Sequence, residues 1–213
     1  IGDSLVEPGL PLTRIDQRYD ASTVMIAAAA RADGAHTYPA GILPTSSDQI
    51  ATSLGEQLVR ADLVLVNSEI GPAVRDALAE LGRFEVCRVD GFGSAFAFGL
   101  AGAEQVPTLV LPGDPVAGFL GYQLFARPLV EQLAGRSPSE PERVSARLAA
   151  DVAADPQRAT IVLADYTGEL VRPLPASGEQ GAIELAAANA AILVGPASAP
   201  IAAQSDVDCW LLS

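Results

Sequence analysis

A stiff turn at residues 112–115 joins a strand-like run to a helix-like run and could hold a ligand. It reads Pro-Gly-Asp-Pro, ends an apolar run over 108–111, and opens a long apolar segment of helical character. Two prolines around a glycine restrict the backbone, and the N–H groups at a helix start attract anions. A strand-to-helix turn without any ligand is the alternative interpretation. The candidate ligand-binding residues of the turn are Pro112, Gly113, Asp114 and Pro115.

Acidic side chains from separate loops could instead gather a cation. The four acids considered are Asp3, Glu69, Asp90 and Asp114. Carboxylate oxygens are the ligands that Mg²⁺ prefers, and a bound cation would make the same place attractive to an anion. Asp3 and Asp114 are therefore candidate metal ligands. Carboxylates that are merely solvated on loops are the alternative.

The charge balance excludes some classes of partner. The chain has 213 residues, a net charge of -13, and no lysine, so all 13 basic residues are arginine. Nucleic-acid binding is not expected, because no basic stripe is present to neutralise phosphates. No apolar run approaches the ~20 residues of a membrane span, so a membrane partner is not expected either.

Two cysteines and the start of the sequence bear on the compartment. Cys87 and Cys209 have no CxxC context, which favours free thiols in a reducing compartment over a disulfide. The first residues show no signal peptide. We therefore expect a cytoplasmic protein. Because residue 1 is Ile rather than Met, we also expect the quoted chain to begin inside a longer polypeptide.

Helix-like and strand-like segments alternate over the first 133 residues. Helices are expected at 20–33, 48–60, 72–82 and 115–133, and strands at 36–43, 62–66, 84–89, 94–99 and 107–111. Such alternation predicts crossover connections and a mostly parallel sheet in a three-layer α/β domain. The continuous apolar run from Asp62 to Val66 predicts a central strand, covered on both faces.

The pattern changes after a linker-like stretch, GRSPSEP, at 135–141. Short alternating segments separated by Gly-containing turns then continue to the end, with one short helix near 183–188. This is typical of a small all-β barrel or sandwich. We therefore expect an α/β domain at 1–136 and a β-domain at 137–213.

Short motifs follow one another along the chain in an informative order. The first are GDSLVEPG, YDAS and DLVLVNS; FAFG, LPGDPVAG and LFARPLVEQLAG come next, and VSARLAAD, GELVRPLP and LAAANAAILV occupy the last third. None is specific alone. Their order and spacing over the whole chain resemble the molybdopterin molybdenumtransferase family, the group that includes MoeA and the gephyrin E-domain.

The resemblance implies a fold, a ligand and a reaction. It implies a MogA-like, molybdopterin-binding α/β domain followed by the family's C-terminal β-domain, without the two N-terminal subdomains of that family. It further implies insertion of molybdate into molybdopterin or adenylyl-molybdopterin, with Mg²⁺, by a homodimer. Besides the turn at 112–115, the ligand-binding residues that it implies are Asp3, Asp20, Ser22, Asn67, Ser68, Glu69 and Gly71.

The departures from the family pattern fall on the ligand loops. A Gly-Gly-rich loop should follow DLVLV, but residues 67–76 carry Glu69 and no double glycine. The family's M-K-P-G-K-P box reads VDGFGSAF at 89–96, without lysine, and Asp114 replaces an asparagine. A carboxylate near a phosphate opposes binding by roughly 1–4 kcal/mol, and a lost charged hydrogen bond costs about 1.5–3 kcal/mol. Together these would remove most of a micromolar affinity, about 8 kcal/mol.

Two functions are therefore open at this point. The first is a molybdenum cofactor biosynthesis protein whose pterin binding and molybdate insertion are weakened or lost, with Arg75 and Arg88 as the nearest cations. The alternative is a non-catalytic scaffold of the same family that binds a protein partner. In either case the apolar helix after Pro115 leads us to expect self-association as a dimer.

Overall fold

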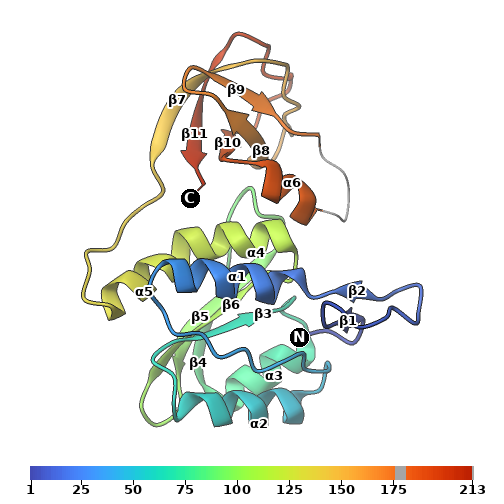
Figure 1. The fold of residues 1–213 in the computed structure, drawn as a ribbon, viewed down its shortest axis with the longest axis vertical. Helices are drawn as coiled ribbons and strands as arrows, with labels where there is room; N and C mark the ends of the chain where they lie inside the picture. The colour runs from blue at the N-terminus through green and yellow to red at the C-terminus, as the bar shows by residue number, and fades with distance from the viewer. Residues whose placement is uncertain (176–180, 213) are drawn as a thin grey trace. The chain divides into compact units, whose positions relative to one another are not determined.

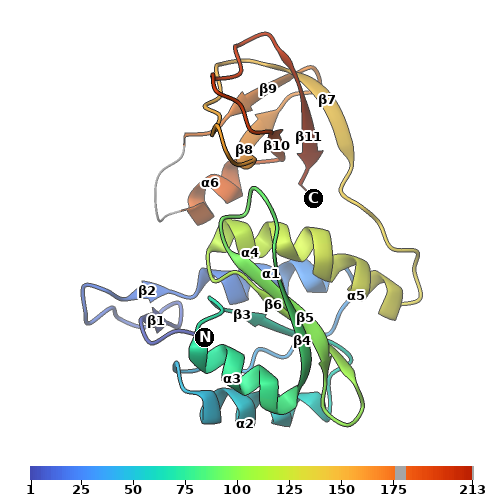
Figure 2. The same ribbon diagram turned by 180° about the vertical axis from the view of Figure 1, so that it is seen from behind.

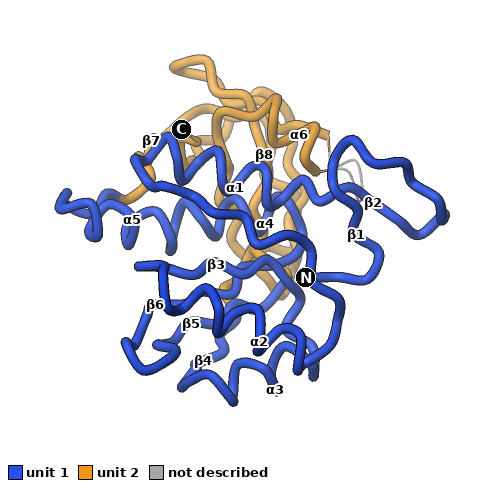
Figure 3. The backbone as a smooth tube through the Cα atoms, turned by 60° about the horizontal axis from the view of Figure 1, so that its bottom comes forward, with its two compact units in different colours: residues 1–88, 94–139 blue, residues 89–93, 140–213 orange. Residues whose placement is uncertain are grey.

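The computed structural model describes residues 1–175 and 181–212. They form two compact units (Figure 3). The first comprises Ile1–Arg88 and Ser94–Ser139, and the second Val89–Gly93 and Glu140–Ser213. None of the described helices is both long enough and apolar enough to cross a bilayer.

The first unit is a three-layer α/β fold around a four-stranded sheet (Figure 1). In spatial order the strands are β3 (Val64–Asn67), β6 (Val106–Leu111), β5 (Ala95–Ala101) and β4 (Gly82–Arg88). One face is covered by α1 (Ala21–Ala32) and by a continuous helical segment made of α4 (Pro115–Gly121), the π-helix η1 (Tyr122–Ala126) and α5 (Arg127–Leu133). The other face is covered by α2 (Ser47–Leu58) and α3 (Pro72–Leu81), as the view from behind in Figure 2 also shows. Near the N-terminus, β1 (Leu5–Val6) and β2 (Arg18–Tyr19) form a short parallel pair.

Three details of the sheet differ from the sequence-based expectation. The sheet is not mostly parallel, because only β3 and β6 pair in parallel. Short connections join β4 to β5 and β5 to β6, and such connections bring strands together as antiparallel pairs. The described β3 lies at an edge of the sheet rather than at its centre, and the expected strand at 36–43 is irregular. The three-layer α/β class, followed along the chain by a β-domain, is confirmed.

The expected helices form where their end signals predicted them. The Asp20 carboxylate accepts a hydrogen bond from Thr23 N at 3.0 Å at the start of α1, and Gly34 follows its end with a φ of 92°. Positive φ favours glycine, which has no Cβ. Pro72 begins α3, where its missing N–H costs nothing.

Close packing holds α4 against β5. A Cβ on Gly121 would lie 2.6 Å from Cε1 of Phe96, whose side chain is buried. The Phe96 and Phe125 rings meet in an edge-to-face arrangement with 5.2 Å between their centroids. The helical segment after Pro115 therefore needs a small residue at this crossing.

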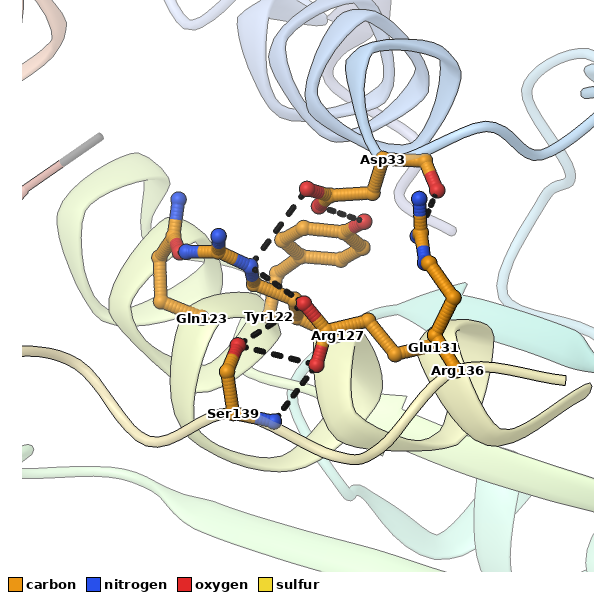
Figure 4. Close-up of polar contacts among 7 residues, drawn as sticks. All are labelled: Asp33, Tyr122, Gln123, Arg127, Glu131, Arg136 and Ser139. Atoms are coloured by element: carbon orange, nitrogen blue, oxygen red, sulfur yellow. Dashed lines mark hydrogen bonds and ion pairs between the residues drawn. The ribbon is translucent and has the colours of Figure 1, made fainter. Parts of the chain in front are cut away.

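A network of paired polar side chains joins the end of α1 to η1 and α5 (Figure 4). The hydroxyl of Tyr122, which is fully buried, donates to Asp33 Oδ2 at 2.7 Å. Arg127 Nε lies 3.4 Å from Asp33 Oδ1 and 3.3 Å from Glu131 Oε1. Glu131 in turn accepts hydrogen bonds from the backbone N and the hydroxyl of Ser139. The network thus also fixes the last residue of the first unit.

The second unit is a closed five-stranded barrel with one short helix. Around the barrel lie β10 (Ala190–Val194), β11 (Asp206–Leu211), β7 (Arg143–Leu148), β9 (Leu170–Pro173) and β8 (Thr160–Tyr166), and the helix is α6 (Gly181–Ala187). Leu148, Val171 and Ile192 fill its interior. The Asn189 side chain pairs with both backbone groups of Tyr166, so its role is structural.

The contact at Gly121 gives a first prediction. Gly121→Ala should lower the free energy of unfolding of the first unit by about 1–3 kcal/mol, because the buried Phe96 ring must move to admit a methyl group. Gly55→Ala is the matched control: it lies within α2, nothing is within 4 Å of the added carbon, and the change should stabilise by ~0.5–1 kcal/mol. Urea unfolding followed by far-ultraviolet circular dichroism measures both. Equal effects of the two substitutions would contradict the packing argument.

The polar network gives a second prediction. Tyr122→Phe should lower the free energy of unfolding by about 1–2 kcal/mol, since a hydrogen bond to a charged carboxylate is lost while the ring stays in place. Circular dichroism should report the loss. An unchanged dichroism midpoint would show that the hydroxyl contributes nothing.

Candidate functional site

The loops that follow β3 and β6 meet at one edge of the sheet. Because the two strands are parallel neighbours, their C-terminal ends lie together. Ser68 N donates to Leu111 O at 3.0 Å, and the Asn67 side-chain amide donates to Pro112 O at 3.0 Å. Open α/β sheets bind ligands outside the carboxyl ends of their strands. The structure thus brings the two predicted ligand loops, 67–71 and 112–115, into direct contact.

Two glycines allow this close approach. A Cβ on Gly118 would lie 2.8 Å from Pro112 O and 2.9 Å from Asn67 Nδ2, so a larger residue would displace the amide that joins the loops. A Cβ on Gly113 would lie 3.4 Å from Glu69 N. Gly113 was among the predicted residues, whereas Gly118 was missed, because nothing in the sequence marks a helix glycine as a contact for a loop.

Both nearby helix starts already carry a carboxylate. Asp114 accepts a hydrogen bond from Ala117 N at 2.8 Å, and Asp20 does the same for Thr23 N at 3.0 Å. Such caps occupy the backbone donors and the positive end of the helix dipole that would otherwise attract an anion. Asp114 and Asp20, which were predicted to bind a ligand, therefore also cap helices. Capping competes with anion binding at both positions.

The remaining predicted residues differ in how accessible they are. Ser22 is buried within α1, and Ser68 is buried with its hydroxyl donating to Glu69 O at 2.9 Å. Glu69 is exposed, and one of its oxygens accepts a 3.4 Å hydrogen bond from Ser94. Gly71 immediately precedes α3 as its N-cap. In the loop 67–71, the charged side chain that is exposed to solvent is therefore that of Glu69.

The predicted metal ligands have other partners. Asp3 is exposed and accepts a hydrogen bond from Thr45 N at 2.9 Å, and this backbone hydrogen bond lowers the pKa of its carboxyl. The Asp114 carboxylate caps α4. Among residues 1–175 and 181–212 no three His, Cys, Asp or Glu side chains gather as a metal site would require. These residues do not fit a side-chain magnesium site, so we derive no step through a metal.

The two arginines that the sequence offers as the nearest cations lie at the surface. Arg75 and Arg88 are both exposed. Asp90 belongs to the segment that groups with the second unit. The single histidine, His36, is exposed on the segment after α1, not on the loops that follow β3 and β6. The arrangement therefore suits binding and orienting a ligand through backbone groups.

Sequence reasoning also missed the contact of Ile1 with the end of β3. The backbone nitrogen of Ile1 donates to Asn67 O at 2.8 Å. No residue type in the sequence signals such a contact.

Comparisons with known proteins agree with this geometry. Residues 1–132 match the family described as a probable molybdopterin binding domain. Molybdopterin molybdenumtransferase 1 of Mycobacterium tuberculosis is 35% identical over 136 residues, which are 62% of this chain and 32% of the relative. Molybdopterin molybdenumtransferase 2 of the same organism is 28% identical over 162 residues, 67% of this chain and 37% of the relative. The chain thus spans about a third of these relatives.

Solved structures show the same fold. A molybdopterin biosynthesis MoeA protein from Pyrococcus horikoshii superposes with a TM-score of 0.80 at 21% identity, over 99% of this chain and 52% of the other. A molybdenum cofactor biosynthesis protein from Pyrococcus furiosus gives 0.68 at 19% identity, over 91% and 65%. The family match covers more than half of the chain. With its geometry and motif order, the chain belongs to the family described as a probable molybdopterin binding domain.

Proposed function

We propose that the edge formed by the loops after β3 and β6 binds an anionic pterin, molybdopterin or its adenylylated form, with lower affinity than an active molybdenumtransferase. The observation that carries this proposal is the junction of the two loops, where Asn67 donates to Pro112 O and Ser68 N to Leu111 O. Membership of the family supplies the ligand class. The ligand is the substrate of the reaction rather than a resident group.

Electrostatics supports the weakened affinity. The carboxylates of Asp20 and Asp114 occupy the starts of α1 and α4, and the exposed Glu69 adds a third negative charge on the intervening loop. Like charges within several ångströms of a phosphate oppose binding even in water. The chain contains no lysine that could compensate.

Molybdate insertion is the activity named for the curated relatives, and here we propose that it is weak or lost. Insertion brings a second anion to a bound anion, so it needs more positive charge than pterin binding alone. The described loops supply backbone N–H groups, but the charged side chains that they expose are acidic.

The proposed compartment is the cytoplasm, in keeping with Cys87 and Cys209 as free thiols.

A second candidate function is a scaffold that binds protein, including another copy of this chain. Phe98 and Leu100 lie two residues apart on β5, so they share one face of the sheet, and both are about half exposed. Contiguous apolar side chains on a surface mark interaction sites. We propose that a homodimer forms through these two side chains. On the helical segment Tyr122 is fully buried, whereas Phe125 and Leu133 are exposed.

The charge argument predicts the effect of one substitution. Asp114→Asn should strengthen binding of molybdopterin and of molybdate about fivefold, because it removes a charge while asparagine still caps the helix. Isothermal titration calorimetry at low salt measures the change, and salt near ~0.5 M should reduce it by screening.

Glu104→Gln is the matched control. It removes the same charge at an exposed position in the turn before β6, at the opposite end of that strand from Asp114. Glu104→Gln should leave the affinities for molybdopterin and molybdate unchanged. If wild type binds molybdopterin at micromolar concentration without metal and Asp114→Asn adds nothing, the charge argument is wrong. If neither protein binds molybdopterin at millimolar concentration, the ligand assignment fails.

The proposed dimer gives a further prediction. Phe98→Arg should shift the chain toward monomer, with at least a tenfold weaker dimer, because a solvated charge would enter the apolar contact. Sedimentation equilibrium over a concentration series measures the association. Val59→Arg, at a strongly exposed position after α2, is the control and should leave association unchanged. A wild-type chain that stays monomeric at high concentration would rule out the dimer.

A further inference from the structure

The start of β5 brings a third segment to the edge formed by the loops after β3 and β6. Because β5 runs antiparallel to β6, its first residues lie beside the last residues of β6, as the pairing of Ala97 with Val110 shows. Ser94 directly precedes β5, and its hydroxyl donates to Glu69 Oε1 at 3.4 Å. The side chain of Glu69 therefore reaches from the loop 67–71 to the start of β5.

The backbone of Glu69 is held from two directions. Its carbonyl oxygen accepts hydrogen bonds from the Ser68 hydroxyl and from Gly71 N, both at 2.9 Å. The turn after β6 lies against its amide, since a Cβ added to Gly113 would be 3.4 Å from Glu69 N. A side chain on a fixed backbone loses less conformational freedom when it binds a ligand. Glu69 is therefore well placed to orient one.

Glu69 differs in its contacts from the two other carboxylates near the edge. Asp20 and Asp114 each accept a backbone N–H at the start of a helix. Among residues 1–175 and 181–212, the Glu69 carboxylate bonds to Ser94 alone, and no arginine forms an ion pair with it. Because Glu69 is exposed, its remaining acceptor positions are open to a ligand that carries N–H donors.

We propose that Glu69 determines the specificity of this edge by binding the donor edge of a pterin ring, the ring N3–H and the adjacent 2-amino group, and not the phosphate of the ligand. An ionised carboxylate accepts only, and it has about four lone-pair positions, so the bond from Ser94 leaves room for two more. Two N–H groups side by side on a planar ring match its two oxygens as the guanidinium of arginine does. The inference rests on the proposed function, because it names the part of the pterin that this edge recognises.

One negative charge then has opposite effects on the two ends of the ligand. The Glu69 carboxylate attracts the donor edge of the ring and repels the phosphate. Neutralising this side chain should therefore weaken binding of the ring while it strengthens binding of phosphate. A residue that only repelled anions would not discriminate between rings that carry no phosphate.

The test compares two rings that differ at one position and carry no phosphate. The compound 6-hydroxymethylpterin has the 2-amino group, whereas 6-hydroxymethyllumazine has a carbonyl oxygen there, an acceptor that would face the carboxylate. In mildly acidic buffer, where both rings are uncharged, their intrinsic fluorescence reports binding to the 213-residue chain. The chain should bind the pterin about tenfold more tightly than the lumazine, because the lumazine leaves the carboxylate without its second donor.

Three variants assign the preference to one side chain. Glu69→Gln should remove the preference for the pterin and strengthen binding of inorganic phosphate about fivefold. Asp114→Asn should also strengthen phosphate binding but keep the preference, because the Asp114 carboxylate caps α4. Glu104→Gln, which removes an exposed charge before β6, should change neither.

Equal binding of the two rings by the wild-type chain would overturn the inference, as would a preference that survives in Glu69→Gln. Failure of both rings to bind at millimolar concentration would overturn it as well. If molybdopterin binds by calorimetry while the two rings bind equally, the inference fails and the proposed function stands. If the pterin is preferred through Glu69 but molybdopterin does not bind, the proposed function fails and the role of Glu69 in recognising the ring stands.

Discussion

The parallel pairing of β3 with β6 is the constraint on which the rest of the first unit depends. It places the ends of two strands that are far apart in sequence at one edge, where Asn67 can bond to Pro112 O. It also sets the start of the long helical segment beside that edge, since only three residues separate the end of β6 from Pro115. The remaining pairs, β5 with β6 and β4 with β5, form through short connections and extend the sheet away from the site.

Much of this fold could be predicted from local signals. Asp20, Gly34 and Pro72 bound their helices because a cap, a positive φ and a first-turn proline act within a few residues. Strand direction could not be predicted in this way, because it depends on which neighbour each strand finds. The apolar run at 62–66 correctly indicated a strand, yet in the described residues β3 has a neighbour on one side only.

The meeting of the two candidate loops was predictable in outline, whereas the contacts between them were not. Motif order identified both loops, but the pairing of Asn67 with Pro112 and the small size needed at Gly118 arise only when distant segments meet. Asp114 shows the physical conflict most clearly. The residue that stabilises the helix start is also the charge that an anionic ligand would meet there, so fold stability and ligand affinity make opposite demands on one side chain.

The chain passes between its two units more often than a linker alone would require. Residues Val89–Gly93 leave the first unit between β4 and β5, group with the barrel, and return before Ser94, where Gly91 forms a bridge with Thr160. Gly91 has a φ of 95°, and a Cβ there would lie 2.8 Å from Ile161 Cγ1. A cut between Ser139 and Glu140 would therefore not yield two self-sufficient modules. If the barrel were exchanged by recombination, Val89–Gly93 would have to be exchanged with it. The evolution of the two units is therefore linked.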